Sequence, residues 1–181
     1  MKEIRLHGRG GQGIVKSAEV IVYAAVQEGK FVACFPYFGF EKKGGPVSAF
    51  VRIDDKKIRE KNQVYFPHCI IVLDPTIMGA TDVFQGARED CVLVINARSV
   101  DSLDIPDQIT TIAYIDATAL SEELLGRKVP NTVMLGAYAK ATGWTDVEKL
   151  AGRAGEIWGE KNRDAVLRGY SDVTVIRRGE V

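Results

Sequence analysis

The chain has 181 residues, of which 46% are apolar, and its 24 basic residues balance its 24 acidic residues, so the formal net charge is zero. This length and composition suit one folded domain over residues 1–181 and exclude a disordered chain. Zero net charge gives no general attraction to nucleic acid, and no apolar run approaches the roughly 20 residues that span a bilayer, so we expect neither a nucleic-acid partner nor a membrane partner.

The N-terminal segment predicts a strand at residues 3–7, a glycine turn and a helix at residues 14–27. Because the strand begins without the apolar segment of a signal peptide, we expect a cytoplasmic protein. Gly8, Gly10 and Gly13 have the spacing G-x-G-x-x-G, which lets a chain present backbone N–H groups and a helix N-terminus to an anion. Glycines also serve plain tight turns, so the pattern leaves an anion site and a purely structural turn open.

A dinucleotide site would also need a carboxylate about 20 residues after the glycines, at the end of the second strand, to hold a ribose. The second predicted strand, at residues 31–35, is followed by Pro36, and the next carboxylate is Glu41. A free-standing dinucleotide-binding oxidoreductase is therefore the alternative. A phosphate contact from another ligand, or a subunit interface, is favoured over it.

Residues 36–46 lead to a strand predicted at residues 47–53, which could run antiparallel and make the sheet mixed. This loop combines three aromatic residues with the charged run 41–43 and a Gly-Gly-Pro turn, a composition typical of a binding loop. The aromatic rings could equally tuck under the edge of the sheet. If the first two strands run parallel, the loop and the glycine turn emerge at the same carboxyl edge, where open α/β sheets bind ligands.

Further strands are predicted at residues 69–73, 92–95, 111–115 and 173–176, and further helices at residues 75–84, 118–125, 132–141, 146–158 and 161–169. The alternation predicts an α/β fold: a three-layer α/β/α domain with a mainly parallel or mixed central sheet and a helical C-terminal third. We expect this last third to form an arm rather than a further layer.

Polar residues at the ends of elements predict helix caps. Asp74 and Asp116 end strands where helices begin, and Asn131 precedes the helix predicted at residues 132–141. Within that helix, Gly136 permits close approach of another helix, either in this chain or in a neighbouring subunit.

The histidines and cysteines predict no metal site. His7 and His68 lack further ligands at metal-binding spacing, so we expect both to be hydrogen-bonded structural residues. Cys34, Cys69 and Cys91 are isolated and are expected to be small buried residues. An iron–sulfur cluster needs four ligands, so any redox centre would lie on a partner.

Three segments together resemble one family, the gamma subunit of the 2-oxoacid:ferredoxin oxidoreductases, which also occurs as an internal domain. They are residues 7–13 (His-Gly-Arg-Gly-Gly-Gln-Gly), residues 35–36 with 41–53, and residues 130–137. The likeness runs over about residues 3–169 and is nearest to the pyruvate and 2-ketoisovalerate members. It leaves an indolepyruvate or other aryl 2-oxoacid enzyme open as an alternative.

The resemblance implies a heteromeric cytoplasmic enzyme of anaerobic metabolism that decarboxylates a 2-oxoacid, nearest to pyruvate, with coenzyme A as co-substrate. Its products would be an acyl-CoA, carbon dioxide and reduced ferredoxin. Thiamine diphosphate, magnesium and 4Fe–4S clusters would belong to alpha, beta and delta-type partner subunits, and ferredoxin would be reached through the complex. This chain would hold no cofactor alone, would supply no catalytic residue and would be inactive in isolation.

On the resemblance, this chain is structural and contacts coenzyme A. The residues expected to line that contact are Gly8, Arg9, Gly10, Gly11, Gln12, Gly13, Glu41, Lys42, Lys43 and Asn131. Coenzyme A is polyanionic, so backbone N–H groups, a helix N-terminus and basic side chains would hold its phosphates. The charged run contains lysines where relatives commonly carry arginine. Lysine does not bind an anion in the bidentate manner of arginine, so we do not expect bidentate anion binding there.

Overall fold

A seven-stranded mixed sheet forms the centre of the computed structural model, which describes residues 1–38 and 44–179. The strands are β1 (Lys2–Arg9), β2 (Phe31–Phe38), β3 (Pro46–Asp54), β4 (Cys69–Val72), β5 (Cys91–Asn96), β6 (Ile109–Ile115) and β7 (Thr174–Arg177). The α-helices are α1 (Ile14–Gln27), α2 (Ala117–Leu125), α3 (Asn131–Thr142), α4 (Val147–Trp158) and α5 (Glu160–Asp172), and η1 (Pro75–Gly79) is a 3-10 helix. None of the helices in these two ranges is both long and apolar enough to cross a membrane.

The strand order β2-β3-β1-β4-β5-β6-β7 explains why the sheet is mixed. β1, β4, β5 and β6 run parallel, whereas β3 returns antiparallel between β2 and β1, and β7 is antiparallel to β6. The predicted antiparallel strand at residues 47–53 is therefore confirmed. Because β3 is antiparallel to both of its neighbours, β1 and β2 point the same way and end at the same edge of the sheet.

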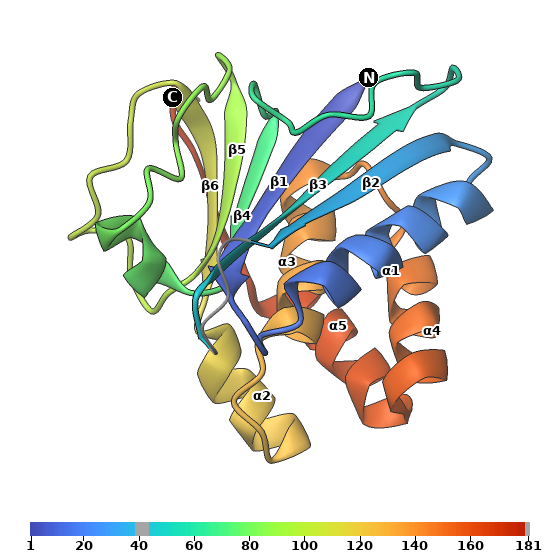
Figure 1. The fold of residues 1–181 in the computed structure, drawn as a ribbon. Coiled ribbons are helices and arrows are strands. Elements are labelled where there is room, and N and C mark those ends of the chain that lie inside the picture. The colour runs from blue at the N-terminus through green and yellow to red at the C-terminus, as the bar shows by residue number, and fades with distance from the viewer. Residues whose placement is uncertain (39–43, 180–181) are drawn as a thin grey trace.

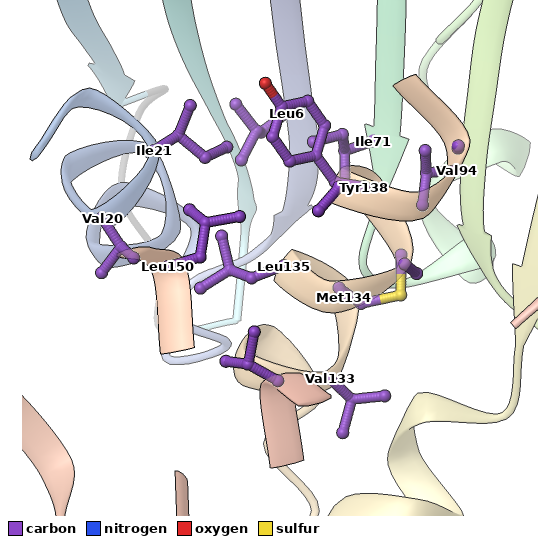
Figure 2. Close-up of a cluster of buried hydrophobic side chains, with 14 of the residues drawn as sticks. Leu6, Val20, Ile21, Ile71, Val94, Val133, Met134, Leu135, Tyr138 and Leu150 are labelled. Carbon is purple, nitrogen blue, oxygen red and sulfur yellow. The ribbon is translucent and has the colours of Figure 1, made fainter. Parts of the chain in front are cut away.

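All five α-helices lie on one side of the sheet (Figure 1). α3 runs between the sheet and the outer helices, and Tyr138 on α3 is fully buried beside Leu6 of β1 and Ile71 of β4 (Figure 2). Leu150 of α4 and Ile21 of α1 belong to the same apolar cluster. The α/β class, the mixed sheet and the helical C-terminal third are thus confirmed.

The opposite face of the sheet is covered by η1 and by connecting segments, so the third layer of the expected α/β/α arrangement is made of a 3-10 helix and loops rather than of α-helices within the described residues. Ile77, Val83 and Ile105 come from these segments and pack on the outward residues of β4, β5 and β6. The helix predicted at residues 75–84 is wrong beyond Gly79. Asp82 there accepts a hydrogen bond from the backbone N–H of Phe84, a local turn that competes with helix continuation.

The C-terminal helices form an additional layer, so the expectation of an arm is wrong. α3 packs on β5 and β6, and α5 packs against α3 at two glycines. A Cβ on Gly136 would lie 1.9 Å from the carbonyl oxygen of Val166, and one on Gly169 would lie 2.0 Å from that of Val133. The close approach predicted at Gly136 is thus made within this chain.

Candidate functional site

The glycine turn predicted after β1 is present at residues 10–13, between β1 and α1. Gly11 and Gly13 have φ values of 92° and 81°, a region that glycine enters without steric cost. Gly13 is the N-cap of α1 and supplies no side-chain cap, and the first turn of α1 contains no acidic residue. The first N–H groups of this helix are therefore available to an anion.

Two glycines of the motif lie directly against neighbouring side chains. A Cβ on Gly8 would lie 2.4 Å from the Cδ1 atom of Ile14, and one on Gly13 would lie 2.8 Å from the Nδ2 atom of Asn131. In contrast, a Cβ on Gly10 would meet only the backbone nitrogen of Gly44, at 3.6 Å. The motif therefore combines two closely packed glycines with an open helix N-terminus.

Arg9 and Gln12 are held by a polar network at the end of β1. The Gln12 amide donates to the Oδ2 atom of Asp74 at 2.9 Å and accepts from the backbone N–H of Arg9 at 2.7 Å. The Arg9 guanidinium donates to the Thr76 hydroxyl at 3.0 Å and lies 3.3 Å from the Asp74 carboxylate. Burial alone would raise the pKa of Asp74, but hydrogen bonds from Thr76 and Gln12 and the charge of Arg9 outweigh it and lower that pKa.

The glycine turn and the β2–β3 hairpin meet at the carboxyl edge of the sheet, as the sequence predicted. The backbone N–H of Gly10 donates to the carbonyl of Gly45 at 3.0 Å, and the Arg9 guanidinium donates to the carbonyl of Gly44 at 3.3 Å. Arg9 thus fastens the returning arm of the hairpin to β1. The charged run Glu41, Lys42 and Lys43 lies outside the described residues.

The helix caps predicted by sequence are partly confirmed. Asp74 caps η1 by accepting from the backbone N–H of Thr76, and Asp116 caps α2 by accepting from that of Ala119. The prediction that Asn131 caps α3 is wrong, because the N-cap is Pro130 and Asn131 is already the first helical residue. One residue of difference turns the Asn131 amide away from the helix end and against Gly13.

A hollow of about 220 Å³ opens beside the glycine turn. It is lined by Gly11, Gly13, Lys16, Leu125, Arg127, Val129, Asn131, Trp158 and Asn162. A second hollow of about 280 Å³ shares four of these residues, Leu125, Arg127, Trp158 and Asn162, and continues to Gly159, Glu160 and Lys161. We call the two together the glycine groove.

The polar groups of the glycine groove suit a phosphate-bearing ligand with a flat ring. The Asn131 side chain is 7% exposed and makes no hydrogen bond within residues 1–38 and 44–179, so its amide is available in the groove. Arg127 forms no ion pair within the same residues and is exposed, while Trp158 is half-buried. Guanidinium groups bind phosphate oxygens bidentately, and indole rings stack on aromatic bases.

Among the residues of this groove that sequence reasoning missed are Lys16, Arg127, Trp158 and Asn162. Lys16 stands three residues after Gly13 and could have been found from its place in the first turn of α1. The others come from the α2–α3 connection and from α4 and α5. No local pattern links those segments to the glycine turn.

The structure also gives a reason against a dinucleotide site. In that kind of site, the second strand lies beside the first and presents a carboxylate to the ribose. Here β3 lies between β1 and β2, and β2 ends at Tyr37 and Phe38. The position that the ribose contact requires is therefore filled by an antiparallel strand.

The histidines and cysteines take structural places. The Nδ1 atom of His7 lies 3.2 Å from the Ser48 hydroxyl, and that of His68 accepts from the backbone N–H of Glu3 at 3.1 Å, as predicted. Cys69 and Cys91 are buried, as expected, and burial raises the pKa of both thiols. Cys34 is exposed on β2, so the expectation that it is buried is wrong.

Comparisons with known proteins agree with this architecture. A family model described as pyruvate ferredoxin/flavodoxin oxidoreductase matches residues 3–171. The chain is 42% identical over 181 residues to the pyruvate synthase subunit PorC of Methanothermobacter thermautotrophicus, covering 98% of each chain. It is 41% identical to the pyruvate/ketoisovalerate oxidoreductases common subunit gamma of Pyrococcus furiosus, covering 97% of this chain and 98% of that one. The crystal structure of the pyruvate oxidoreductase subunit PORC of Thermotoga maritima superposes with a TM-score of 0.84 at 31% identity, covering 96% of this chain and 97% of that chain.

Proposed function

The chain belongs to the pyruvate ferredoxin/flavodoxin oxidoreductase family, and from this premise we propose that it is the gamma subunit of a heteromeric, cytoplasmic 2-oxoacid:ferredoxin oxidoreductase that acts on pyruvate. The observation that carries the proposal is the nearly end-to-end match to a PorC subunit and to a common subunit gamma. The complex would convert pyruvate and coenzyme A to acetyl-CoA, carbon dioxide and one proton, and would pass two electrons to ferredoxin.

The electron-transfer groups would lie on the alpha, beta and delta-type partners, because the cysteines of this chain do not fit an iron–sulfur cluster. Cys69 belongs to the apolar cluster under the helices, whereas Cys91 belongs to the cluster on the opposite face of the sheet. Burial raises the pKa of Cys91 to about 12, so this thiol stays protonated, whereas a cluster binds thiolates. Thiamine diphosphate with magnesium would supply carbanion chemistry on a partner.

The choice of substrate would also lie with the partners. The Pyrococcus furiosus relative is named as the gamma subunit common to the pyruvate and ketoisovalerate oxidoreductases, so one gamma subunit serves two 2-oxoacids there. The same logic extends to aryl 2-oxoacids such as indolepyruvate. Pyruvate is favoured here because PorC of Methanothermobacter thermautotrophicus and PORC of Thermotoga maritima are both named for pyruvate.

The contribution of this chain would be to hold part of coenzyme A in the glycine groove. The open N-terminus of α1, the Asn131 amide and the charges of Lys16 and Arg127 would bind phosphate oxygens. Trp158 would pack against the adenine ring. Arg9 is engaged by Asp74 and Thr76, so we assign it to holding the hairpin rather than to gripping the ligand.

The coenzyme A contact is tested by Arg127→Ala in the assembled complex. Removing one exposed guanidinium from a phosphate contact should raise the KM for coenzyme A by roughly 5- to 10-fold. Dye reduction that depends on pyruvate before acyl transfer should stay unchanged, because that half-reaction does not use coenzyme A. The measurement is steady-state kinetics of the purified complex with each substrate varied in turn.

Lys128→Ala is the matched control. Lys128 is the next residue along the chain, is 68% exposed at its side chain and pairs with Glu122, but it does not line the groove. Its variant should keep the KM of the native complex. Equal KM values for the two variants would remove the coenzyme A contact from this chain and leave its role as a subunit intact.

A further inference from the structure

Gln12 supplies the only side chain of the glycine turn, because the other three residues, Gly10, Gly11 and Gly13, have none. Glycine has more conformational freedom than any other residue, so a turn of this composition does not hold one shape by itself. If a side chain of the turn fixes its shape, that side chain is Gln12.

The polar atoms of Gln12 close the turn on one side and attach it to the sheet on the other. Its backbone N–H donates to the carbonyl of Arg9 at 3.2 Å, and its Oε1 atom accepts from the backbone N–H of the same residue at 2.7 Å. Its Nε2 atom donates at 2.9 Å to the Oδ2 atom of Asp74, which is 62 residues away in the chain. Both ends of the amide therefore bind this chain, and Gln12 does not belong to the lining of the glycine groove.

Asp74 is a fixed point to which the turn is attached. Its Oδ1 atom accepts from the backbone N–H of Thr76 at 3.0 Å and from the hydroxyl of Thr76 at 2.7 Å, and its side chain is only 16% exposed. It follows β4, which pairs with β1 in parallel. The hydrogen bond from Gln12 thus ties the turn to the end of a neighbouring strand.

The other side of the turn faces the glycine groove. Gly13 follows Gln12 directly, and a Cβ on Gly13 would lie 2.8 Å from the Nδ2 atom of Asn131. The backbone N–H of Ser17 donates to the carbonyl of Gly13 at 2.8 Å and begins the hydrogen-bond ladder of α1. The N–H groups of residues 14–16 precede this ladder, so the turn that Gln12 holds sets their direction.

We propose that Gln12 is a positioning residue for coenzyme A: it holds the glycine turn against Asp74, so that the N–H groups of residues 14–16 face the glycine groove before the ligand arrives. The inference rests on the function proposed above. It gives Gln12 an indirect role in place of the direct contact expected from the sequence. A site that is ordered in advance loses less conformational entropy on binding and so binds more tightly.

Gln12→Met tests this role without a change in charge. Methionine is unbranched like glutamine but has no amide, so the turn loses its hydrogen bonds to Arg9 and Asp74. In the assembled complex we expect the KM for coenzyme A to rise about 10-fold, with pyruvate-dependent dye reduction before acyl transfer unchanged. Gln27→Met, at an exposed position at the other end of α1, is the matched control and should keep the native KM.

Gln12→Glu and Asp74→Asn together provide a rescue. Each substitution alone breaks the hydrogen bond, because it opposes two carboxylates or two N–H donors, and each should raise the KM for coenzyme A about 10-fold. The double variant reverses the bond, since the asparagine amide donates to the glutamate carboxylate, and its KM should return to within about 2-fold of the native value. Repulsion of the anionic ligand by a carboxylate would instead make Asp74→Asn alone lower the KM.

Hydrogen exchange of the complex without coenzyme A gives a measurement that does not depend on turnover. Amides of residues 9–12 should exchange about 10-fold faster in Gln12→Met than in the native complex, and at the native rate in the double variant. Unchanged exchange in Gln12→Met, absence of rescue in the double variant, or an equal loss of pyruvate-dependent dye reduction overturns the positioning role.

The comparison with Arg127→Ala separates this inference from the proposed function. A higher KM for coenzyme A in Arg127→Ala but not in Gln12→Met would overturn the positioning role and leave the proposed contact intact. A native KM in both variants, together with faster exchange of residues 9–12 in Gln12→Met, would overturn the proposed coenzyme A contact and the positioning role with it.

Discussion

The protonation of one residue, His7, makes the stability of the whole fold depend on pH. It is 4% exposed, its Nε2 atom has no hydrogen-bond partner within the described residues, and burial, with a smaller effect of the Arg5 charge, lowers its pKa to about 3. The unfolded chain binds a proton at this histidine below about pH 6.5, whereas the folded chain does not. Stability contributed by neutral His7 is therefore complete above pH 6.5 and is lost as the pH falls toward 3.

His7→Asn should reduce this acid sensitivity, because the amide of asparagine can replace Nδ1 at Ser48 but does not titrate. From pH 6.5 to 5 the His7 linkage costs the native chain about 2 kcal/mol of unfolding free energy, and the variant should lack that loss. Urea unfolding at a series of pH values measures it. Parallel curves of unfolding free energy against pH for the native chain and His7→Asn would contradict this role of His7. Ser48→Ala is the control: it keeps the histidine, so its unfolding free energy should fall with pH as steeply as that of the native chain.

At the scale of elements, the crossing of α3 and α5 depends on glycine. The Cβ of an alanine at position 136 would stand 1.9 Å from the carbonyl oxygen of Val166, which belongs to the backbone of α5 and cannot rotate away. We expect Gly136→Ala to lower the unfolding free energy by about 3 kcal/mol through displacement of α5. Chemical denaturation measures the change.

Gly152→Ala provides the comparison, since Gly152 is also helical but has no atom within 4 Å of the position of an added Cβ. Relief of backbone entropy should make this variant about 0.5–1 kcal/mol more stable. If Gly136→Ala raises the unfolding free energy as Gly152→Ala is expected to, helix propensity rather than the contact between α3 and α5 governs position 136.

At the scale of the whole molecule, buried arginines fix the loops over the second face of the sheet. The Arg5 guanidinium donates to the carbonyls of Val64, Val83 and Gln85, which belong to two separate connecting segments. Connecting segments satisfy few of their own carbonyl groups, so a buried cation with several donors replaces the hydrogen bonds that a helix would have made internally. This explains how a face of the sheet is closed without α-helices.

Arg5→Met should therefore loosen this cover while the helical side stays intact. Loss of three hydrogen bonds, two of them buried, should speed amide exchange about 10- to 100-fold in residues 62–66 and 82–86, with little change in α1 and α3. Hydrogen exchange followed by mass spectrometry resolves the segments. Arg98→Met, at a side chain that is 86% exposed, is the control and should leave amide exchange at its native rate. An equal effect of both variants would contradict the role of Arg5 in holding these two segments.

Local sequence patterns predicted the glycine turn and its neighbours, but they did not predict the distant residues that complete the site. The strand, glycine turn and helix at residues 3–27 were predictable because each depends on near neighbours. Asp74 was predictable as a cap for the same reason. Arg127 and Trp158 were not, because they reach the glycine turn from segments more than a hundred residues away, and the one-residue offset at Asn131 decided between a helix cap and a groove amide.

The sequence by itself determined the α/β class, the mixed sheet, the position of the glycine turn and the family, because apolar periodicity, glycine spacing and short motifs are local properties of the chain. Only the tertiary structure decided which residues surround that turn, that β3 separates β2 from β1, and that the last helices pack as a layer. These outcomes depend on contacts between distant segments, in which shape and the satisfaction of buried polar groups select one arrangement among many that the same local patterns allow.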